Sequence, residues 1–316
     1  MSATSPTIAV VVPVYNEEAV LPELFRRVSA VFDAQPGVTW RAVLVDDGSR
    51  DRSADVVHAQ SLADPRWTLV ELSRNFGFQS ALSAGLNEAR AADAVITMDA
   101  DLQDPPELIP ALVQAWRDGG SVVRAVRRSR KESGLRRMGF DLFHATFARL
   151  SDLPIESNTG TFGLLSHDAI EAFHQLPERN RFFPGLRAWI GFPTSDVLYD
   201  RDERAAGEPQ QTFSRLLRYA FDGVFSFSYL PLRILTYVGC AVSGLGFALG
   251  LFFIVRRILG IEIASIGFTS LITMVTFLGG VQLIGVGVLG EYLGRIYDEV
   301  KQRPLYVVKR RGEPRR

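Results

Sequence analysis

The amino-acid sequence predicts an α/β fold in which helices cover both faces of a mostly parallel sheet, followed by a membrane-embedded C-terminal region. Over residues 1–125, short β-branched apolar runs alternate with amphipathic helical patterns. Strands that alternate with helices form parallel sheets covered on both faces. Nearer the C-terminus, residues 234–255 and 263–290 form runs of 22 and 28 residues without a charge.

Each element of the α/β region has its own signal. Residues 7–14 form a short β-branched run that marks the first strand, and apolar residues recur at helical spacing over 17–32. Pro105 and Pro106 open a helix, because proline is tolerated in a first helical turn. In chain order we expect strands at 7–14, 42–45, 68–72, 94–98 and 122–126, and helices at 17–32, 51–62, 79–89 and 105–117.

The two charge-free runs are long enough to cross a membrane, since about 20 residues span the hydrocarbon. Residues 256–262 connect them, so we expect a two-helix transmembrane hairpin with both ends on one side; buried core helices are the alternative. Residues 212–227 combine aromatic side chains with Arg215 and Arg218. This composition is typical of an amphipathic helix on a membrane surface, although a core-facing helix would have a similar pattern.

Charge predicts the side on which the hairpin ends lie. Lys+Arg and Asp+Glu both total 35, so overall charge gives no indication of nucleic acid as a partner. Residues 292–316, however, hold eight basic and three acidic residues, and basic segments stay cytoplasmic; Arg256 and Arg257 argue weakly the other way. No signal peptide precedes the first domain. We therefore expect a cytoplasmic catalytic domain at 1–210, a membrane-surface helix at 211–230, two spans within 231–291 and a basic cytoplasmic tail at 292–316.

Polar clusters follow three of the predicted strands. They are Pro13-Val14-Tyr15-Asn16-Glu17, Asp46-Asp47-Gly48-Ser49 and Asp99-Ala100-Asp101-Leu102-Gln103. Each cluster alone is typical of a turn or a helix cap. The carboxyl ends of parallel strands meet at one edge of a sheet, where ligands bind, so the three together predict a binding site.

The chemistry of these residues favours a nucleotide and a hard cation. Two carboxylates in one loop, Asp99 and Asp101, suit Mg²⁺ or Mn²⁺, which takes its remaining oxygens from water and a diphosphate; Gln103 adds a neutral oxygen. Such a cation offsets the charge that develops on a nucleoside diphosphate leaving group. Tyr15 offers an aromatic face to a base, and Asp46 can accept a hydrogen bond from uracil or guanine N–H.

The segments VVVPVYNEE, VLVDDGSRDRS, LSRNFGFQSALSAGL and ITMDADLQDPPELI resemble family-two glycosyltransferases of the polyprenyl-phosphate hexosyltransferase branch. Dolichyl-phosphate mannose synthases and bactoprenol glucosyltransferases belong to this branch. Further similar stretches, including DGVFSFSYLPLR and GVLGEYLGRIYDEVKQRPLYVV, extend the resemblance over nearly the whole chain. It implies a Rossmann-like GT-A fold and inverting, metal-dependent transfer of a hexose from a nucleotide-sugar, such as UDP-glucose, to a polyprenyl phosphate at the bacterial inner membrane.

The resemblance also implies roles for individual residues. It implies that the nucleotide is bound by Pro13, Tyr15, Glu17, Asp46 and Asp47. It implies that Asp99, Asp101 and Gln103 hold the metal and the diphosphate, and that Asp99 and Asp101 are the catalytic residues. For the acceptor phosphate we expect bidentate arginine contacts from Arg127, Arg128, Arg130, Arg201 and Arg204, with a solvated basic surface as the alternative.

Several positions depart from the family pattern. Thr161 stands where relatives have an aspartate that is a candidate catalytic base, and Pro184 stands where they have an arginine. Phe78 replaces a histidine, and Pro209-Gln210-Gln211 replaces Ser-Lys-Tyr. Two hypotheses follow: an active transferase, or a degenerate homologue that binds nucleotide-sugar or lipid, or scaffolds a partner, without turnover. The spacings Gly246/Gly250 and Gly290/Gly294 also favour close helix packing and a homo-oligomer.

Overall fold

The structure is a computed structural model of the 316-residue chain, and it describes residues 5–128, 159–200, 230–259 and 267–312. The chain divides into two compact units. The first comprises Met1–Ala220 together with Arg303–Arg316, and the second comprises Phe221–Gln302. The predicted surface helix at 212–227 lies outside the described residues, as do residues 260–266.

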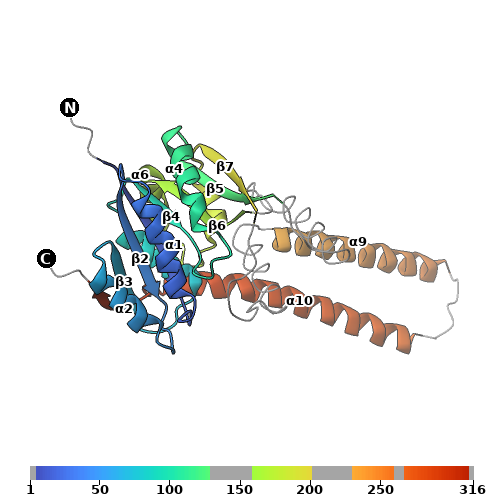
Figure 1. The fold of residues 1–316 in the computed structure, drawn as a ribbon. Coiled ribbons are helices and arrows are strands. Elements are labelled where there is room, and N and C mark those ends of the chain that lie inside the picture. The colour runs from blue at the N-terminus through green and yellow to red at the C-terminus, as the bar shows by residue number, and fades with distance from the viewer. Residues whose placement is uncertain (1–4, 129–158, 201–229, 260–266, 313–316) are drawn as a thin grey trace. The chain divides into compact units, whose positions relative to one another are not determined.

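The first unit is built on an eight-stranded sheet of order β7-β5-β6-β4-β1-β2-β3-β8 (Figure 1). Its strands are β1 (Thr7–Val14), β2 (Thr39–Asp46), β3 (Trp67–Leu72), β4 (Ala94–Thr97), β5 (Val122–Arg127), β6 (Thr159–Ser166), β7 (Thr194–Tyr199) and β8 (Val308–Gly312). The four strands β3, β2, β1 and β4 are mutually parallel. β6 and β8 run antiparallel to their neighbours. The prediction of a mostly parallel sheet is therefore confirmed.

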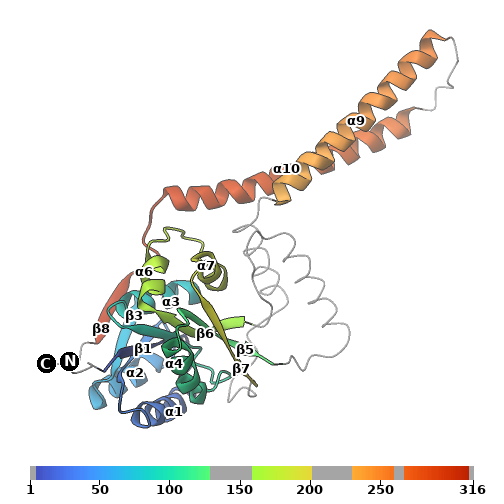
Figure 2. The ribbon, with the colours of Figure 1, turned by 90° about the horizontal axis from the view of Figure 1, so that it is seen from above.

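Helices cover both faces of this sheet, as the sequence predicts. On one face, α1 (Leu21–Asp33), α2 (Ser53–Ala63) and α4 (Ile109–Arg117) share a core with the even-numbered residues of β1. α3 (Phe78–Glu88) packs on β1 and β2 from the other face. Figure 2 shows α1 and α4 on one side of the sheet, and α6 (His167–His174) and α7 (Phe183–Trp189) on the other.

The element boundaries differ from the predictions at the ends. α1 begins at Leu21 because residues 18–20 form a turn, in which Val20 and Leu21 donate to the Glu17 carbonyl. Pro106–Leu108 form a short 3-10 turn, η1, before α4. β2 is longer than predicted at both ends. Strand order and helix order along residues 7–127 agree with the sequence analysis.

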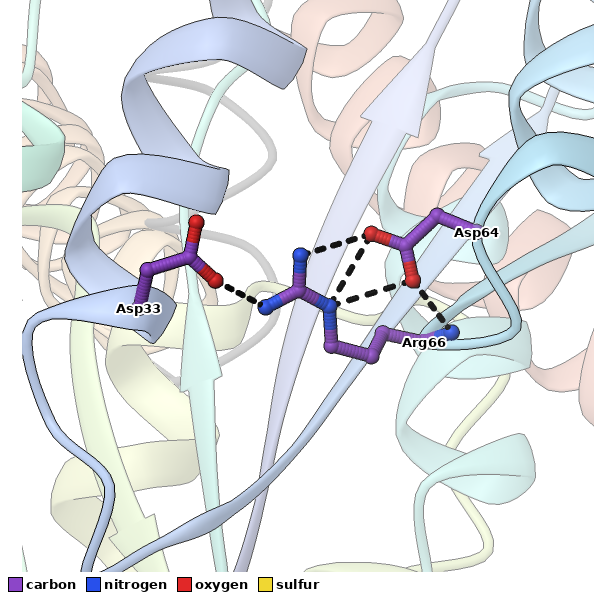
Figure 3. A network of polar contacts seen from close by, with 3 residues as sticks. All are labelled: Asp33, Asp64 and Arg66. Carbon is purple, nitrogen blue, oxygen red and sulfur yellow. Dashed lines mark hydrogen bonds and ion pairs between the residues drawn. The ribbon is translucent and has the colours of Figure 1, made fainter.

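Arg66 ties two helices together at the edge of the sheet opposite the polar loops. Its guanidinium lies 2.7 Å from a carboxylate oxygen of Asp33 at the end of α1, and 2.7 Å from one of Asp64 just after α2 (Figure 3). The Arg66 backbone N–H also donates to Asp64, at 2.9 Å. This bidentate contact fixes the geometry of two chain reversals.

The eighth strand falls in the stretch predicted to be a basic tail. α10 (Phe268–Val300) continues past residue 291, and β8 then pairs antiparallel with β3. The Ser73 N–H donates to the Val307 carbonyl at 2.9 Å, just beyond the paired residues. The C-terminal segment therefore covers an edge of the sheet that would otherwise present unpaired backbone groups.

The second unit contains two long helices, α9 (Leu230–Ile258) and α10. Within the described residues, one helical segment, Phe277–Val300, is long and apolar enough to cross a membrane, and only 6% of its most apolar stretch is buried. That exposure argues against a buried core helix. Ile234–Leu249 of α9 is a shorter apolar segment, so the two-span hairpin remains a prediction.

Close helix contact in this unit occurs at a different glycine from those predicted. A side chain at Gly285 would lie 3.3 Å from the Leu235 methyl groups, which brings α10 against α9. Around Gly246, Gly290 and Gly294 the space is open. A homo-oligomer that uses these glycines stays a prediction.

Gly85 is the tightest point between α3 and the sheet. A methyl group there would lie 2.2 Å from Val11 Cγ1 and 3.1 Å from Val45 Cγ2, both on buried β-branched side chains. We expect Gly85→Ala to destabilise the first unit by about 1–2 kcal/mol, because overpacking outweighs the gain in helix propensity. Thermal unfolding measures this. Gly37→Ala, at a glycine with nothing within 4 Å, is the control; equal melting temperatures for both variants would contradict the packing argument.

Candidate active site

The loops after β1 and β2 form one hydrogen-bonded surface at the carboxyl edge of the sheet. The Asn16 N–H donates to Ser49 Oγ at 3.0 Å, and the Arg50 N–H donates back to Asn16 Oδ1 at 2.8 Å. The Glu17 N–H donates to Ser53 Oγ at 2.9 Å. Asn16 has a φ of 55°, a left-handed conformation that asparagine tolerates. Two of the predicted clusters are therefore brought together.

Asp47 joins a third loop to this surface. Its two carboxylate oxygens accept from the backbone N–H groups of Phe76 and Gly77, at 2.7 and 2.9 Å. Burial raises the pKa of Asp47, and these two hydrogen bonds act against that rise. Gly48 is at a φ of +67°, and a side chain there would meet the Arg74 carbonyl carbon at 2.5 Å. Asp47 is predicted to bind the nucleotide. In the structure its carboxylate instead binds the backbone of the loop before α3.

Asp46 is the best candidate for a ligand contact. It ends β2 with 1% of its surface exposed. Its Oδ2 accepts from the Ser49 N–H at 3.2 Å, whereas Oδ1 has no hydrogen-bond partner among the residues that the structure describes. Burial raises the pKa of Asp46, the contacts with Ser49 lower it, and the charge of Glu71 raises it further. An unsatisfied buried acceptor requires an explanation, and a nucleobase N–H would satisfy it.

The other predicted nucleotide residues flank Asp46. Pro13 is buried near the end of β1, opposite Val45. Pairing between β1 and β4 stops at Val11 and Thr97, so the missing N–H of Pro13 breaks no bond of that ladder. Tyr15 and Glu17 are half-buried in the following loop. The topology places all three at the same edge as Asp46, while their contacts with a nucleotide stay predictions.

The third cluster follows β4, on the other side of β1. Asp99 Oδ1 accepts from Thr161 Oγ1 at 2.9 Å. Desolvation raises the pKa of Asp99 to about 7, and the charges of Asp104 and Asp101 add to the rise. Asp101 accepts from the Gln103 N–H at 3.2 Å. Leu102 between them has a φ of 56° with its side chain buried in the core, so packing holds the loop in a strained conformation.

The sequence analysis missed a buried network beside Asp99. The Tyr199 hydroxyl on β7 donates to Asp104 Oδ1, and the Arg127 Nε donates to the Tyr199 oxygen at 3.1 Å. Arg127 Nη2 also lies 3.6 Å from Asp104 Oδ1. Burial raises the pKa of Tyr199, which keeps the phenol protonated as a donor. The carboxylate spacing Asp99, Asp101, Asp104 is the one signal in the sequence that pointed to this network.

The predicted acceptor arginines have differing surroundings. Arg127 is half-buried and engaged with Asp104 and Tyr199. Arg128 is exposed and lies 3.8 Å from Asp200. Arg130, Arg201, Arg204 and Gln210 lie outside the described residues. Pro184 is buried in the first turn of α7.

A divalent cation fits the third cluster only in part. Within the described ranges, no group of three or more His, Cys, Asp or Glu side chains is placed to hold a metal ion. Asp99 and Asp101 supply two carboxylates, and Mg²⁺ is commonly held by one or two carboxylates while substrate phosphates and water complete its shell. Burial and the charges of Asp104 and Asp101 raise the pKa of Asp99, so a bound cation would stabilise its ionised form. The residues therefore fit a site that a bound diphosphate would complete.

The comparisons with known proteins agree with this architecture. Residues 9–173 match the family model described as glycosyl transferase family 2. An uncharacterised glycosyltransferase of Synechocystis sp. is 44% identical, with 95% of this chain and 94% of that protein covered. A prophage-derived bactoprenol glucosyl transferase of Shigella flexneri is 41% identical, with 97% and 99% covered.

Solved structures are more distant. A mannosyltransferase from Pyrobaculum calidifontis, in complex with GDP-Man and Mn²⁺, is 15% identical, with a TM-score of 0.43 and with 95% of this chain and 89% of that chain covered. Family assignment rests instead on the matched model and on the relatives above 40% identity. The chain belongs to glycosyl transferase family 2.

Proposed function

We propose that this protein transfers a hexose from a nucleotide-sugar, such as UDP-glucose, to undecaprenyl or another polyprenyl phosphate, with inversion at the anomeric carbon. The observation that supports it best is the pairing of a buried, unsatisfied acceptor on Asp46 with the two carboxylates Asp99 and Asp101, on strands that flank β1. The near full-length relatives named bactoprenol glucosyl transferase support the lipid acceptor.

The donor would bind across the carboxyl ends of β2, β1 and β4. Asp46 Oδ1 accepts the N–H of the uracil or guanine ring, and Tyr15 offers its aromatic face to the base. Asp47 holds the loop after β2 against the loop before α3, through its hydrogen bonds with the N–H groups of Phe76 and Gly77. The diphosphate then points toward Asp99 and Asp101, because those residues follow the neighbouring strand β4.

Asp99, Asp101 and Gln103 would hold Mg²⁺ or Mn²⁺ against the diphosphate. When bound, such a cation offsets the negative charge that develops on the leaving group. Asp104 stays bonded to Tyr199 and close to Arg127, so it serves the arrangement of the loop.

The acceptor phosphate performs the attack. One of its oxygens forms the bond to the anomeric carbon, while the bond from that carbon to the diphosphate oxygen breaks and its electron pair leaves with the diphosphate. A phosphate monoester has a second pKa of about 6, so the acceptor arrives largely ionised and requires positioning rather than deprotonation. Arg128, with Arg130, Arg201 and Arg204, would supply the positive charge.

Localisation follows from the acceptor and from the apolar helices. We infer a multi-pass protein of the bacterial inner membrane with the catalytic domain in the cytoplasm, where nucleotide-sugars are made. Among the described residues, the exposed apolar segment Phe277–Val300 supports one span, and the second span rests on the charge-free run 234–255 of the sequence.

A transfer assay tests the proposed function. Membranes containing the protein, incubated with undecaprenyl phosphate and a panel of nucleotide-sugars, should yield a lipid-phosphate-hexose detectable by mass spectrometry. Asp99→Asn and Asp101→Asn should each lower the rate at least ~100-fold, about 2.7 kcal/mol in barrier, and excess chelator should do the same. Asp55→Asn, at an exposed carboxylate of α2, is the control. Unchanged turnover in both site variants would refute the metal assignment.

Thr161→Asp separates an active enzyme from a degenerate homologue. The Thr161 hydroxyl touches Asp99, so an aspartate there would add a charge beside Asp99, Asp101 and Asp104 and would repel an anionic acceptor. We expect the wild type to transfer sugar and the variant to be equal or slower. A gain on the order of 100-fold would instead show that a missing base limits the wild type. The wild-type rate should also fall as pH drops through about 6.

The proposed topology can be tested by labelling single cysteines. Cys240 is the one cysteine in the chain, so Cys240→Ser provides a cysteine-free background. In intact cells, a membrane-impermeant maleimide should label Leu259→Cys, at the end of α9, and should label Leu62→Cys, on the exposed side of α2, only after lysis. The reverse pattern would show that the orientation is wrong.

A further inference from the structure

The C-terminal strand β8 brings three consecutive cations to the first unit, and each has a different partner. Lys309 Nζ lies 2.5 Å from Glu71 Oε1 on β3. Arg310 Nη2 lies 2.6 Å from the His58 ring on α2. Arg311 Nε lies 3.5 Å from Glu88 on α3. The basic residues of this segment are thus directed at specific sites of the first unit.

A bulge in the pairing directs Lys309 to its partner. Glu71 is opposite Arg310 and Leu72 is opposite Val308, so the register skips Lys309. Bulges of this kind turn a side chain away from the direction that regular pairing would give it. Here the result is that Lys309, rather than Arg310, bonds to Glu71. Glu71 keeps 14% of its side chain exposed and Lys309 keeps 62%, so the carboxylate is the more buried member of the pair.

Glu71 in turn lies beside the nucleotide site. It is the register partner of Asp46 in the parallel pairing of β2 with β3. The Glu71 charge contributes to the rise in the pKa of Asp46, after the larger effect of burial. The pKa of Lys309 is raised first by its hydrogen bond and charge contact with Glu71, and Asp46 adds to that rise. Lys309, Glu71 and Asp46 are therefore electrostatically coupled. Glu71 interacts with the Lys309 ammonium on one side and with Asp46, the candidate base-binding carboxylate, on the other.

We propose that Lys309 is a positioning residue for the nucleotide: by neutralising Glu71, it limits the negative charge beside Asp46 and so strengthens the binding of a uracil or guanine nucleoside diphosphate. This inference rests on the proposed function, because it takes Asp46 as the base contact. It adds a residue from the far end of the chain to a site otherwise built from the first strands.

The charges of Lys309, Glu71 and Asp46 predict the direction in which nucleotide affinity changes when Lys309 is removed. Without Lys309, Glu71 leaves an uncompensated carboxylate near Asp46, which disfavours the ionised form of Asp46 that accepts from a base N–H. Lys309 is largely solvated, so the effect is moderate: we expect about a three- to tenfold loss of affinity.

The test is titration of UDP, with Mg²⁺, into the full-length protein in mild detergent, followed by calorimetry. Lys309→Gln should raise the Kd about three- to tenfold, and Lys309→Arg should restore binding. Arg311→Gln is the matched control, because it removes one positive charge from the same strand but faces Glu88. Its Kd should equal that of the wild type.

A double variant separates the electrostatic role from a structural one. In a Glu71→Gln background there is no carboxylate to neutralise, so adding Lys309→Gln should leave the Kd of the single variant unchanged. Equal affinity of wild type and Lys309→Gln would overturn the inference, as would parallel losses of affinity and melting temperature in both the Lys309 and Arg311 variants. If the wild type itself bound neither UDP nor GDP, the proposed function would fail and the inference with it.

Discussion

Parallel pairing of β1 with both β2 and β4 is the constraint on which the site depends. Because the three strands are parallel, they all end at the same edge of the sheet. The chain returns to the opposite edge through helices that cover one face or the other. The candidate base acceptor Asp46 and the carboxylate pair Asp99 and Asp101 consequently flank one central strand. The strands concerned all belong to the first unit.

Buried negative charge is the energetic cost of this arrangement. Asp46, Asp47 and Asp99 all have raised pKa values, and burial is the largest cause in each case. Both oxygens of Asp47 accept hydrogen bonds, from the N–H groups of Phe76 and Gly77, whereas Asp46 Oδ1 has no partner among the described residues. The negative charge of Asp99 would favour binding of a cation, and that of Asp46 would favour binding of a nucleobase N–H. Carboxylates with raised pKa values are common at ligand-binding sites.

Sequence reasoning could predict what depends on local pattern and chain order. The strands up to β5, the helices between them and the three polar loops follow from alternation and from the rule that ligands bind at the carboxyl ends of parallel strands. It could not predict contacts that depend on register between distant segments. Thr161 reaches Asp99 because β6 inserts antiparallel beside β4, and Tyr199 reaches Asp104 across 95 residues. Similarly, the charge pattern of residues 292–316 predicted a basic cytoplasmic tail, because β8 holds three consecutive basic residues and lacks apolar alternation.

The late position of β8 in the chain has a consequence for biosynthesis. A ribosome completes α9 and α10 before it makes residues 308–312, so the edge of β3 has no strand partner until those residues are made. An unpaired edge is a site for mispairing with other chains. Covering of that edge by β8 therefore comes after the other strands are made, and a nascent chain that stops before Val308 leaves it open, even though every residue of the three polar loops has already been made.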